Sequence, residues 1–261
     1  MKVTLINYTG MGPRLKEIAV NDWHWEEDAR GENAVDQLIF TKSTRLTMSP
    51  GLLSEIAAWP WEKKLEELTY MANTIPSSWE FVDYTFMIET VTRAYTHQQV
   101  RSRQFSFAQQ TMRVLNVSSG HGWDYLTGPS IDDGPTDVQG TSGPMTKRQL
   151  YEAEMERIDE TYKALIADGV KIEDARGILP TNILTNIVGK CNMRTFVELV
   201  RKRSSPRTQN EYRDVLDAMK ESVRQVHPWI DLFIERGVDK AIADLQQIID
   251  NIPFDETRIN A

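Results

Sequence analysis

The chain has 261 residues, with 30 Lys and Arg against 38 Asp and Glu, so its formal net charge is −8. Its hydrophobic content of 40% is typical of a folded globular protein and excludes a disordered one. No stretch of apolar residues is long enough to cross a membrane, and the single cysteine, Cys191, excludes an internal disulfide and a cysteine-rich metal site. We therefore expect a soluble, cytoplasmic protein with no membrane partner.

Strand and helix patterns alternate in the first half of the chain. The short apolar run within residues 1–8 predicts a strand, and helical spacing of apolar residues predicts helices within 52–73. Alternating apolar residues over 81–89 predict a second strand. A helix is expected over 90–101, followed by a polar loop and a strand near 112–117.

A long segment rich in turn-forming residues follows. Residues 116–147 hold six of the fourteen glycines and three of the eleven prolines, which predicts an extended irregular loop inside a single domain, residues 1–261. Thr146 is expected to cap an amphipathic helix that runs to Ala167. The residues expected to face inward from it are Leu150, Ile158, Tyr162, Leu165 and Ile166.

The last third of the chain is predicted to be mainly helical. We expect a short helix over 172–178, a strand over 182–189, a helix from the cap residue Asn192 to Arg203, a helix over 206–227, and two more after Pro228 and Gly237.

Two clusters of basic residues contrast with the acidity of the whole chain. Residues 93–113 contain four arginines and no acid, and residues 190–213 contain seven basic residues against two acids. A nucleic-acid-binding domain is usually basic throughout, so we expect no direct nucleic-acid partner. Concentrated clusters favour pockets for small anions such as phosphate, and the alternative is a pair of solvated helix faces.

The first cluster has spacing suited to an anion. Arg93, His97 and Arg101 are four residues apart and share one helix face, where their mutual repulsion would be relieved by a bound anion. Two arginines then flank Ser102, and hydroxyl and amide side chains lead on to Arg113. Such a segment can donate several hydrogen bonds to phosphate oxygens.

The remaining reactive side chains carry weaker signals. Cys191 follows Lys190 and could be an activated nucleophile, but a lone cysteine is more often a small buried hydrophobe. The four histidines lack metal-ligand spacing, so we expect no metal. His121 lies between two glycines and is either a catalytic candidate or an ordinary loop residue.

Four segments together resemble the flavin-dependent thymidylate synthases. Residues 98–113 resemble the family signature, which reads Arg-His-Arg, seven residues, Ser, and an Arg two positions beyond. Residues 77–80 are similar to the family's Thr-Pro-Phe-Glu segment, and residues 176–182 to its Ala-Arg-x-x-Leu-Pro-x-Asn stretch. Asn192 and Arg203 follow at the family's spacing. The resemblance covers about half of the chain, from about Ser77 to Gln209.

This resemblance implies an α+β fold, with helices packed on an antiparallel sheet and a helix-rich C-terminal half. It implies transfer of one carbon from methylenetetrahydrofolate to carbon 5 of a deoxypyrimidine monophosphate, with FAD as cofactor and NADPH as reductant. Conversion of dUMP to dTMP is the expected outcome. The alternatives are a dUMP or dCMP hydroxymethylase and a non-catalytic nucleotide- or flavin-binding paralogue. Family members are homotetramers, which implies self-association, in the cytoplasm of a bacterium or of a phage-infected host.

The resemblance also implies roles for individual residues. Arg203 is the implied catalytic residue, because it would hydrogen-bond the pyrimidine and polarise it. The implied cofactor-binding residues are Ser77, Arg101, Ser102, Arg103, Gln109, Asn192, Glu198 and Arg207. The implied substrate-binding residues are Gln98, Gln109, Gln110, Thr111, Met112, Arg113, Arg176 and Arg203.

Several positions depart from the family pattern. They are Ser102 for His, Thr111 for Ser, Ala108 for Asn, Gln109 for Glu, Ile75 and Phe81 for His, and Glu198 for Asn. The phosphate-binding arginines remain, whereas residues around the flavin and folate change. We infer a retained nucleotide site and an altered reaction.

Overall fold

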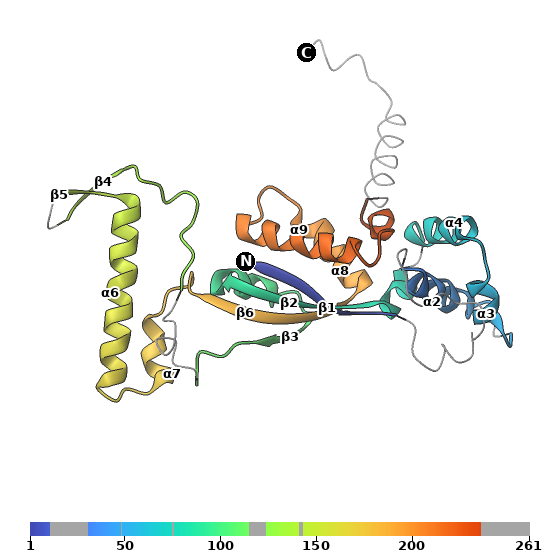
Figure 1. Cartoon of the computed structure of the whole chain (residues 1–261), viewed down its shortest axis with the longest axis horizontal. Helices are drawn as coiled ribbons and strands as arrows, with labels where there is room; N and C mark the ends of the chain where they lie inside the picture. Colours follow the sequence, from blue (N-terminus) through green and yellow to red (C-terminus); the bar gives the residue numbers. More distant parts are fainter. Residues whose placement is uncertain (11–30, 48, 75, 115–123, 141–142, 236–261) are drawn as a thin grey trace, which may run out of the picture. The chain divides into compact units, whose positions relative to one another are not determined.

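The computed structural model describes residues 1–10, 31–47, 49–74, 76–114, 124–140 and 143–235 (Figure 1). The chain forms two compact units. Unit 1 comprises Met1–Lys2 and Met87–Gly189, and unit 2 comprises Val3–Phe86 and Lys190–Ala261. The expectation of one domain over the whole chain stays a prediction. None of the described helices combines the length and the apolarity needed to span a bilayer.

A four-stranded sheet contains the strands predicted at the N-terminus and near residues 81–89 and 182–189. Its strand order is β1 (Lys2–Tyr8), β2 (Asp83–Thr92), β6 (Leu184–Asn192) and β3 (Ser106–Gln109). Strand β2 begins two residues later than predicted, because Pro76–Phe81 form the short 3-10 helix η1. Along both β2 and β6, buried residues alternate with half-buried ones, as in strands that cover a core with one face.

The prediction of a strand near 112–117 is wrong for the residues that the structure describes. Met112 lies in a turn, and the strand is instead β3. Two aromatic rings explain the position of β3: Phe105 and Phe107 stack with their centroids 5.4 Å apart. They lie over Gly189 of β6, where an added Cβ atom would come within 3.3 Å of the Phe107 ring. Packing between distant segments therefore determines where this strand forms.

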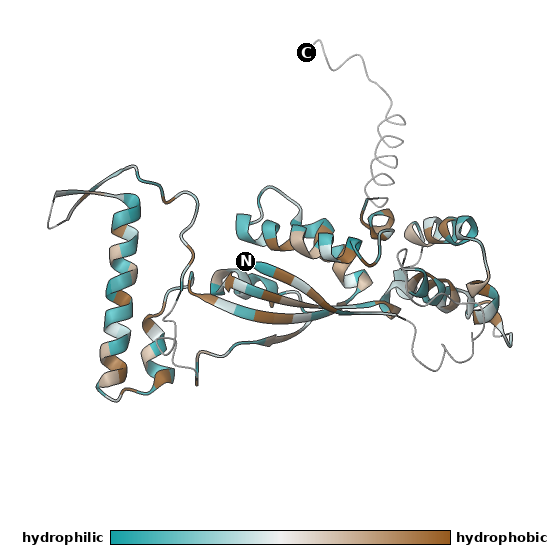
Figure 2. Cartoon of the chain, viewed as in Figure 1, coloured by the Kyte–Doolittle hydropathy of each residue, from teal (hydrophilic) through white to brown (hydrophobic). Residues whose placement is uncertain are grey.

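Unit 2 combines several helices with an aromatic core. The ring of Phe196 lies 5.5 Å from that of Tyr84 and 5.8 Å from that of Phe86, centroid to centroid. Figure 2 shows hydrophobic residues recurring along the strands and helices. The helices of unit 2 are α2 (Glu32–Ser43), α3 (Leu52–Ala57), α4 (Trp61–Ala72), α8 (Met193–Arg203) and α9 (Asn210–Arg224), and residues 230–235 are helical as well.

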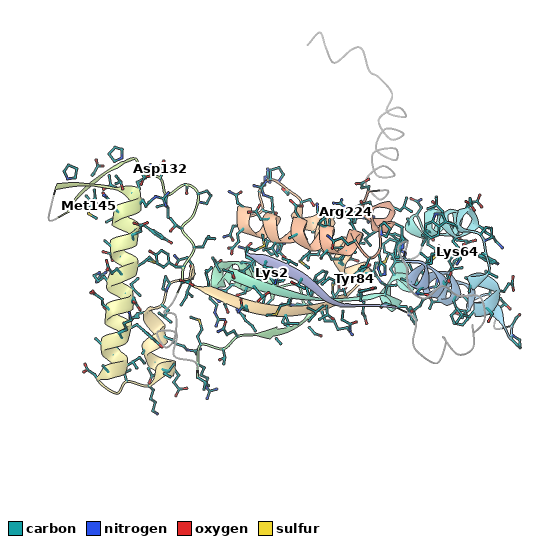
Figure 3. All side chains as sticks on the ribbon, viewed as in Figure 1. Lys2, Lys64, Tyr84, Asp132, Met145 and Arg224 are labelled. Atoms are coloured by element: carbon teal, nitrogen blue, oxygen red, sulfur yellow. The ribbon has the colours of Figure 1, made fainter. Side chains whose placement is uncertain are left out.

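A buried ion pair joins α2 to α4 within unit 2. The ammonium of Lys64 lies 2.8 Å from a carboxylate oxygen of Asp36, and both side chains are almost completely buried. Lys64 also donates a hydrogen bond to the carbonyl oxygen of Ala57, 3.1 Å away. Figure 3 labels Lys64 on α4 and Tyr84 in the sheet. Removing one partner of such a pair leaves an uncompensated buried charge, which is strongly destabilising.

The helices predicted from Asn192 to Arg203, over 206–227 and after Pro228 are confirmed, with shifts at their ends. The side chain of Asn192 caps α8 by accepting a hydrogen bond from the backbone amide of Thr195, 2.9 Å away. The helix predicted over 206–227 begins later, at Asn210, because residues 206–208 form a turn. The helix after Pro228 begins at residue 230, whereas the one after Gly237 lies outside the described residues.

Unit 1 contains a long helix whose cap was predicted. Helix α6 (Lys147–Ala167) begins with a capping box between Thr146 and Gln149. Of the residues expected to face inward, Tyr162 is buried, and the other four are only half-buried. Met155, which was not among them, is the second buried residue of α6. The segment predicted as a helix over 172–178 comprises α7 (Ile172–Ala175) and the 3-10 turn η2 (Arg176–Ile178).

The predicted loop over 116–147 is wrong in its second half. Strands β4 (Pro135–Gly140) and β5 (Gly143–Thr146) form an antiparallel pair there. The start of β4 is tied to the start of α6, because the carbonyl oxygen of Gly134 accepts a hydrogen bond from the amide of Lys147 at 2.9 Å. The ammonium of Lys147 also lies 3.0 Å from the carboxylate of Asp132, which Figure 3 labels.

Candidate nucleotide and cofactor site

Arg93 is anchored to the loop that follows β3. It is the first residue of α5 (Arg93–Gln99), and its side chain is half-buried. Its Nε donates to the sulfur of Met112 at 3.0 Å, and its Nη2 donates to the carbonyl oxygen of Gln110 at 3.2 Å. These contacts hold one guanidinium against a loop that contains several of the predicted substrate-binding residues.

Two further arginines meet at one residue of α7. The Nε of Arg113 lies 3.3 Å from the carboxylate of Glu173, and the Nε of Arg176 donates to the carbonyl oxygen of Glu173, also at 3.3 Å. The pKa of Arg93 is lowered by two effects. The larger is burial, and the smaller is the positive charge of Arg176. We call Arg93, Arg113 and Arg176 the arginine cluster.

The arginine cluster is suited to an anion. It brings three cations together with one carboxylate, that of Glu173, so it keeps a net positive charge. Arg113 is also 70% exposed, so its side chain is open to a ligand. Like charges held together destabilise a folded protein unless a counter-charge binds, and guanidinium groups match the geometry of phosphate oxygens. Sequence reasoning placed Arg113 and Arg176 in the substrate site but omitted Arg93 from it.

The loop next to the arginine cluster is fixed by short contacts. The amide of Gln110 donates to the carbonyl oxygen of Asn186 in β6, 3.1 Å away. The side-chain amide of Gln109 donates to the hydroxyl of Thr96 at 2.9 Å, and the Thr111 hydroxyl accepts from the amide of Arg113 at 3.1 Å. The loop is therefore held at several points before any ligand binds.

Three of the residues predicted to hold the flavin, Arg101, Ser102 and Arg103, lie in the turn region after α5. The amide of Ser102 donates to the carbonyl oxygen of Gln99, and its own carbonyl oxygen accepts from the amide of Phe105, both at 3.0 Å. Arg101 and Arg103, on either side of Ser102, are exposed and form no ion pair with any described residue. Two unpaired guanidinium groups on one turn fit the diphosphate of FAD.

The site residues that were predicted within the second basic cluster, residues 190–213, lie in unit 2. The guanidinium of Arg203, the last residue of α8, lies 5.2 Å from the ring centroid of Tyr212. Arg207 is exposed in the turn before α9. The carboxylate of Glu198 lies 3.3 Å from both Arg194 and Lys202, so it is already engaged by cations of its own helix. Asn192 retains its side-chain amide group as a donor, because only its oxygen is used in capping α8.

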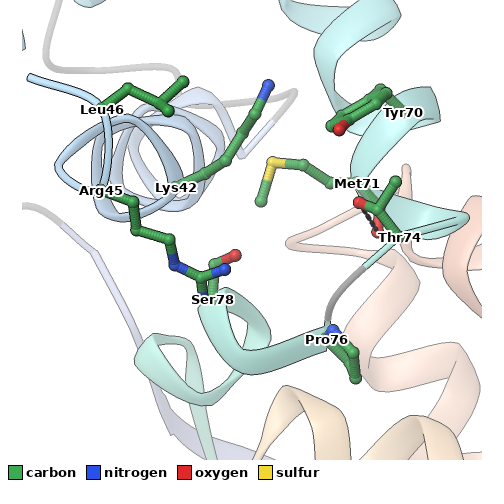
Figure 4. A pocket seen from close by; sticks show the side chains of 8 residues that line it. All are labelled: Lys42, Arg45, Leu46, Tyr70, Met71, Thr74, Pro76 and Ser78. Carbon is green, nitrogen blue, oxygen red and sulfur yellow. Dashed lines mark hydrogen bonds between the residues drawn. The ribbon is translucent and has the colours of Figure 1, made fainter.

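A cavity of about 640 Å³ lies beside Ser77 in unit 2 (Figure 4). The guanidinium of Arg45 donates a hydrogen bond to the hydroxyl of Ser77. Lys42 is paired with Glu67 and lies over the ring of Tyr70, 4.5 Å from its centroid. Sequence reasoning missed Arg45, because it lies outside the four segments that resemble the family pattern. The cavity is lined by Lys42, Arg45, Leu46, Tyr70, Met71, Thr74, Pro76 and Ser78.

Burial accounts for Cys191 and for His227, one of the four histidines. Cys191 is 3% exposed, and burial, with a smaller effect of Asp83, raises the pKa of its thiol well above the usual value. A buried thiol in this state is not a nucleophile, which agrees with the hydrophobic role considered for Cys191. His227 is buried and hydrogen-bonded to the hydroxyl of Tyr84 at 2.9 Å. His121 lies outside the described residues.

Known proteins resemble both the sequence and the fold. Residues 36–229 match the model of the family described as thymidylate synthase complementing protein. A flavin-dependent thymidylate synthase of Geobacter sulfurreducens is 33% identical over 151 residues, which are 58% of this chain and 60% of that relative, less than two thirds of its length. Another, from Sulfolobus acidocaldarius, is 31% identical over 234 residues, 87% of this chain and 74% of that relative.

A crystal structure confirms the predicted fold class. It is that of a UMP/dUMP methylase, PolB, from Streptomyces cacaoi, bound with 5-Br dUMP. It matches with a TM-score of 0.63 and 15% identity, over 90% of this chain and 93% of that one. The α+β fold expected from the sequence resemblance is therefore present. Since the family model matches most of the chain, this protein belongs to the family of thymidylate synthase complementing proteins.

Proposed function

We propose that the protein transfers one carbon from methylenetetrahydrofolate to carbon 5 of dUMP, with FAD as cofactor and NADPH as reductant, and that dTMP is the product. The observation that carries this proposal is the arginine cluster, in which Arg113 and Arg176, from two segments of the family pattern, meet at Glu173. The names of the relatives support the same activity.

The arginine cluster has the charge that a nucleotide monophosphate needs. A phosphate monoester carries close to two negative charges at neutral pH, and three guanidinium groups opposed by one carboxylate balance them. The cluster would hold the phosphate, with the loop residues Gln110, Thr111 and Met112 beside it. Gln98, near the end of α5, would add a neutral donor.

The exposed turn after α5 would bind the flavin. Arg101 and Arg103 would pair with the diphosphate, and the side-chain amide of Asn192 and the hydroxyl of Ser77 would add neutral contacts. Gln109, Glu198 and Arg207 complete the proposed cofactor-binding residues. When bound, the reduced flavin supplies the hydride for the reaction.

Arg203 would activate the pyrimidine. A guanidinium that donates to the base carbonyl stabilises the negative charge that develops as carbon 5 becomes nucleophilic. Its planar pair of donors suits this task better than a lysine ammonium. Because Cys191 is buried with a raised pKa, we assign activation to Arg203 and none of it to a thiolate.

We also propose that the protein works as a homotetramer in the cytoplasm of a bacterium or of a phage-infected host. Family resemblance supports this assembly, since both basic clusters then contribute to sites shared between subunits. Light scattering on the purified protein tests it, and an active monomer would contradict it.

Product analysis tests the proposed reaction. The purified protein is incubated with FAD, NADPH, methylenetetrahydrofolate and either dUMP or dCMP. The nucleotide products are then identified by mass spectrometry. We expect dTMP from dUMP. A hydroxymethyl product would instead mean that water captures the methylene intermediate, and the changed residues Ser102, Ala108 and Gln109 are the first to examine in that case. Binding of nucleotide and flavin without any product would identify a non-catalytic paralogue.

A further inference from the structure

Arg93 has more hydrogen-bond donors than partners. A guanidinium carries five N–H groups, and the two contacts described for Arg93 go to a thioether and to a backbone carbonyl. Neither partner carries a charge. Across the described parts of the chain, Arg93 forms no ion pair with a carboxylate, so its charge is not neutralised there.

The surroundings of Arg93 make an unneutralised charge unfavourable. The side chain is half-buried, and Arg176 adds a like charge. A partly desolvated cation beside another cation lowers stability unless an anion compensates it. Stability alone would favour an apolar residue here, so the charge needs a role in binding.

The contacts of Arg93 direct it toward the proposed phosphate site. Its partners Gln110 and Met112 belong to the loop after β3, which also contains Arg113. Arg113 in turn pairs with Glu173, to which Arg176 is also bound. All of these residues belong to unit 1, so this arrangement stands within one compact unit.

We propose that Arg93 is a further phosphate-binding residue, which makes the site selective for a nucleotide monophosphate over the uncharged nucleoside. This inference rests on the proposed function, since it assumes that the arginine cluster binds a nucleotide. The side chain remains fixed to the loop through Nε and Nη2, and its remaining N–H groups donate to phosphate oxygens. Arg93 thereby supplies the third positive charge, in addition to Arg113 and Arg176.

Two substitutions test this inference. Arg93→Met removes the charge but keeps an unbranched side chain next to Met112, whereas Arg93→Lys keeps the charge without the planar donors. Affinities for dUMP and for deoxyuridine are measured by calorimetry with the full-length protein. We expect Arg93→Met to weaken dUMP binding by about tenfold to a hundredfold, with deoxyuridine changed by less than about twofold. Arg93→Lys should fall between Arg93→Met and the unsubstituted protein.

A matched control separates this effect from a general loss of charge. Arg148 is an exposed arginine of the same unit, paired with Asp133 at 3.2 Å, and Arg148→Met should leave both affinities unchanged. Circular dichroism checks the folding of each variant. If Arg93→Met does not fold, Arg93→Gln, which keeps a neutral donor, is measured in the same way and should show the same selective loss.

The outcomes distinguish this inference from the proposed function. If the unsubstituted protein does not bind dUMP, the proposed function fails and the inference fails with it. If the unsubstituted protein binds dUMP and Arg93→Met binds it equally well, only the inference is overturned. Equal losses for dUMP and deoxyuridine would also overturn it, because Arg93 would then act only by holding the loop.

Discussion

The side-chain oxygen of Asn186 accepts a hydrogen bond from the backbone amide of Thr90 at 2.9 Å, and Thr90 has a φ of 59°. Thr90 is the one non-glycine residue with positive φ among those that the structure describes, and β-branched residues rarely adopt this conformation. The carbonyl oxygen of Asn186 also accepts from the amide of Gln110. One residue of β6 therefore holds both the strand end that leads into Arg93 and the loop proposed to bind substrate.

Asn186→Ala should destabilise the protein and weaken dUMP binding. The strained conformation of Thr90 would lose the side chain that compensates it, so we expect the free energy of unfolding to fall by about 1–3 kcal/mol. Urea unfolding measures this change. Adding Thr90→Gly to the variant should restore part of the loss, because glycine adopts positive φ without the steric penalty. If the free energy of unfolding is instead lower in the double variant than in Asn186→Ala, Thr90 is not the strained residue that Asn186 compensates.

Arg203→Lys should lower turnover far more than it lowers nucleotide affinity. Lysine keeps the charge but not the two planar donors, so we expect kcat to fall by about a hundredfold while the Kd for dUMP changes little. Loss of the contact with Tyr212 should change the free energy of unfolding by only about 1 kcal/mol. Arg194→Lys, in the same helix, is the control and should leave kcat unchanged. Unaltered turnover in Arg203→Lys would leave Arg203 with a structural role only.

Arg101→Ala should weaken FAD binding. Removing a charge-assisted contact to the diphosphate costs about 1.5–3 kcal/mol, which is roughly a tenfold to hundredfold rise in the Kd. Titration of the protein with FAD, followed by the change in flavin fluorescence, measures this effect. Arg157→Ala is a suitable control, because Arg157 is an exposed arginine on α6 paired with Glu154. Equal FAD affinity in Arg101→Ala would remove Arg101 from the cofactor site.

Protein stability should fall in acid because of His227. Burial, opposed by a weaker hydrogen bond that His227 donates to the backbone of Thr9, lowers the pKa of His227 to about 4, against about 6.5 in the unfolded chain. Between these two values the unfolded state binds one proton more than the folded state, so stability decreases as pH falls through this range. The largest contribution of His227 is about 3 kcal/mol. The free energy of unfolding, measured with urea at several pH values, should depend less steeply on pH in His227→Phe than in the unsubstituted protein. An identical pH dependence would exclude this role of His227.

Local signals in the sequence predict helix starts well. Asn192 and Thr146 were expected to cap helices, and both side chains do so, because capping depends only on residues within one turn. The position of β3 could not be predicted in the same way. It depends on the stacking of Phe105 and Phe107 over Gly189, some eighty residues further along the chain.

The proposed phosphate site was predictable only in part. Arg113 and Arg176 lie at recognisable spacings, so sequence reasoning included them. Arg93 was noted as part of a basic helix face but not as a site residue, because its contacts with Gln110 and Met112 exist only in the folded loop. Arg45, which contacts Ser77, lies in the turn after α2, and the sequence carries no motif there.

The burial of Cys191 has a practical consequence. Since it is the only cysteine of the chain and its thiol is buried with a raised pKa, maleimide reagents should leave the native protein unlabelled. A cysteine introduced at an exposed position would then be the single site of attachment, without first removing a natural thiol. Fluorescent or spin labels on α6, for example at Glu160, would report distances between the subunits of the proposed homotetramer directly in solution.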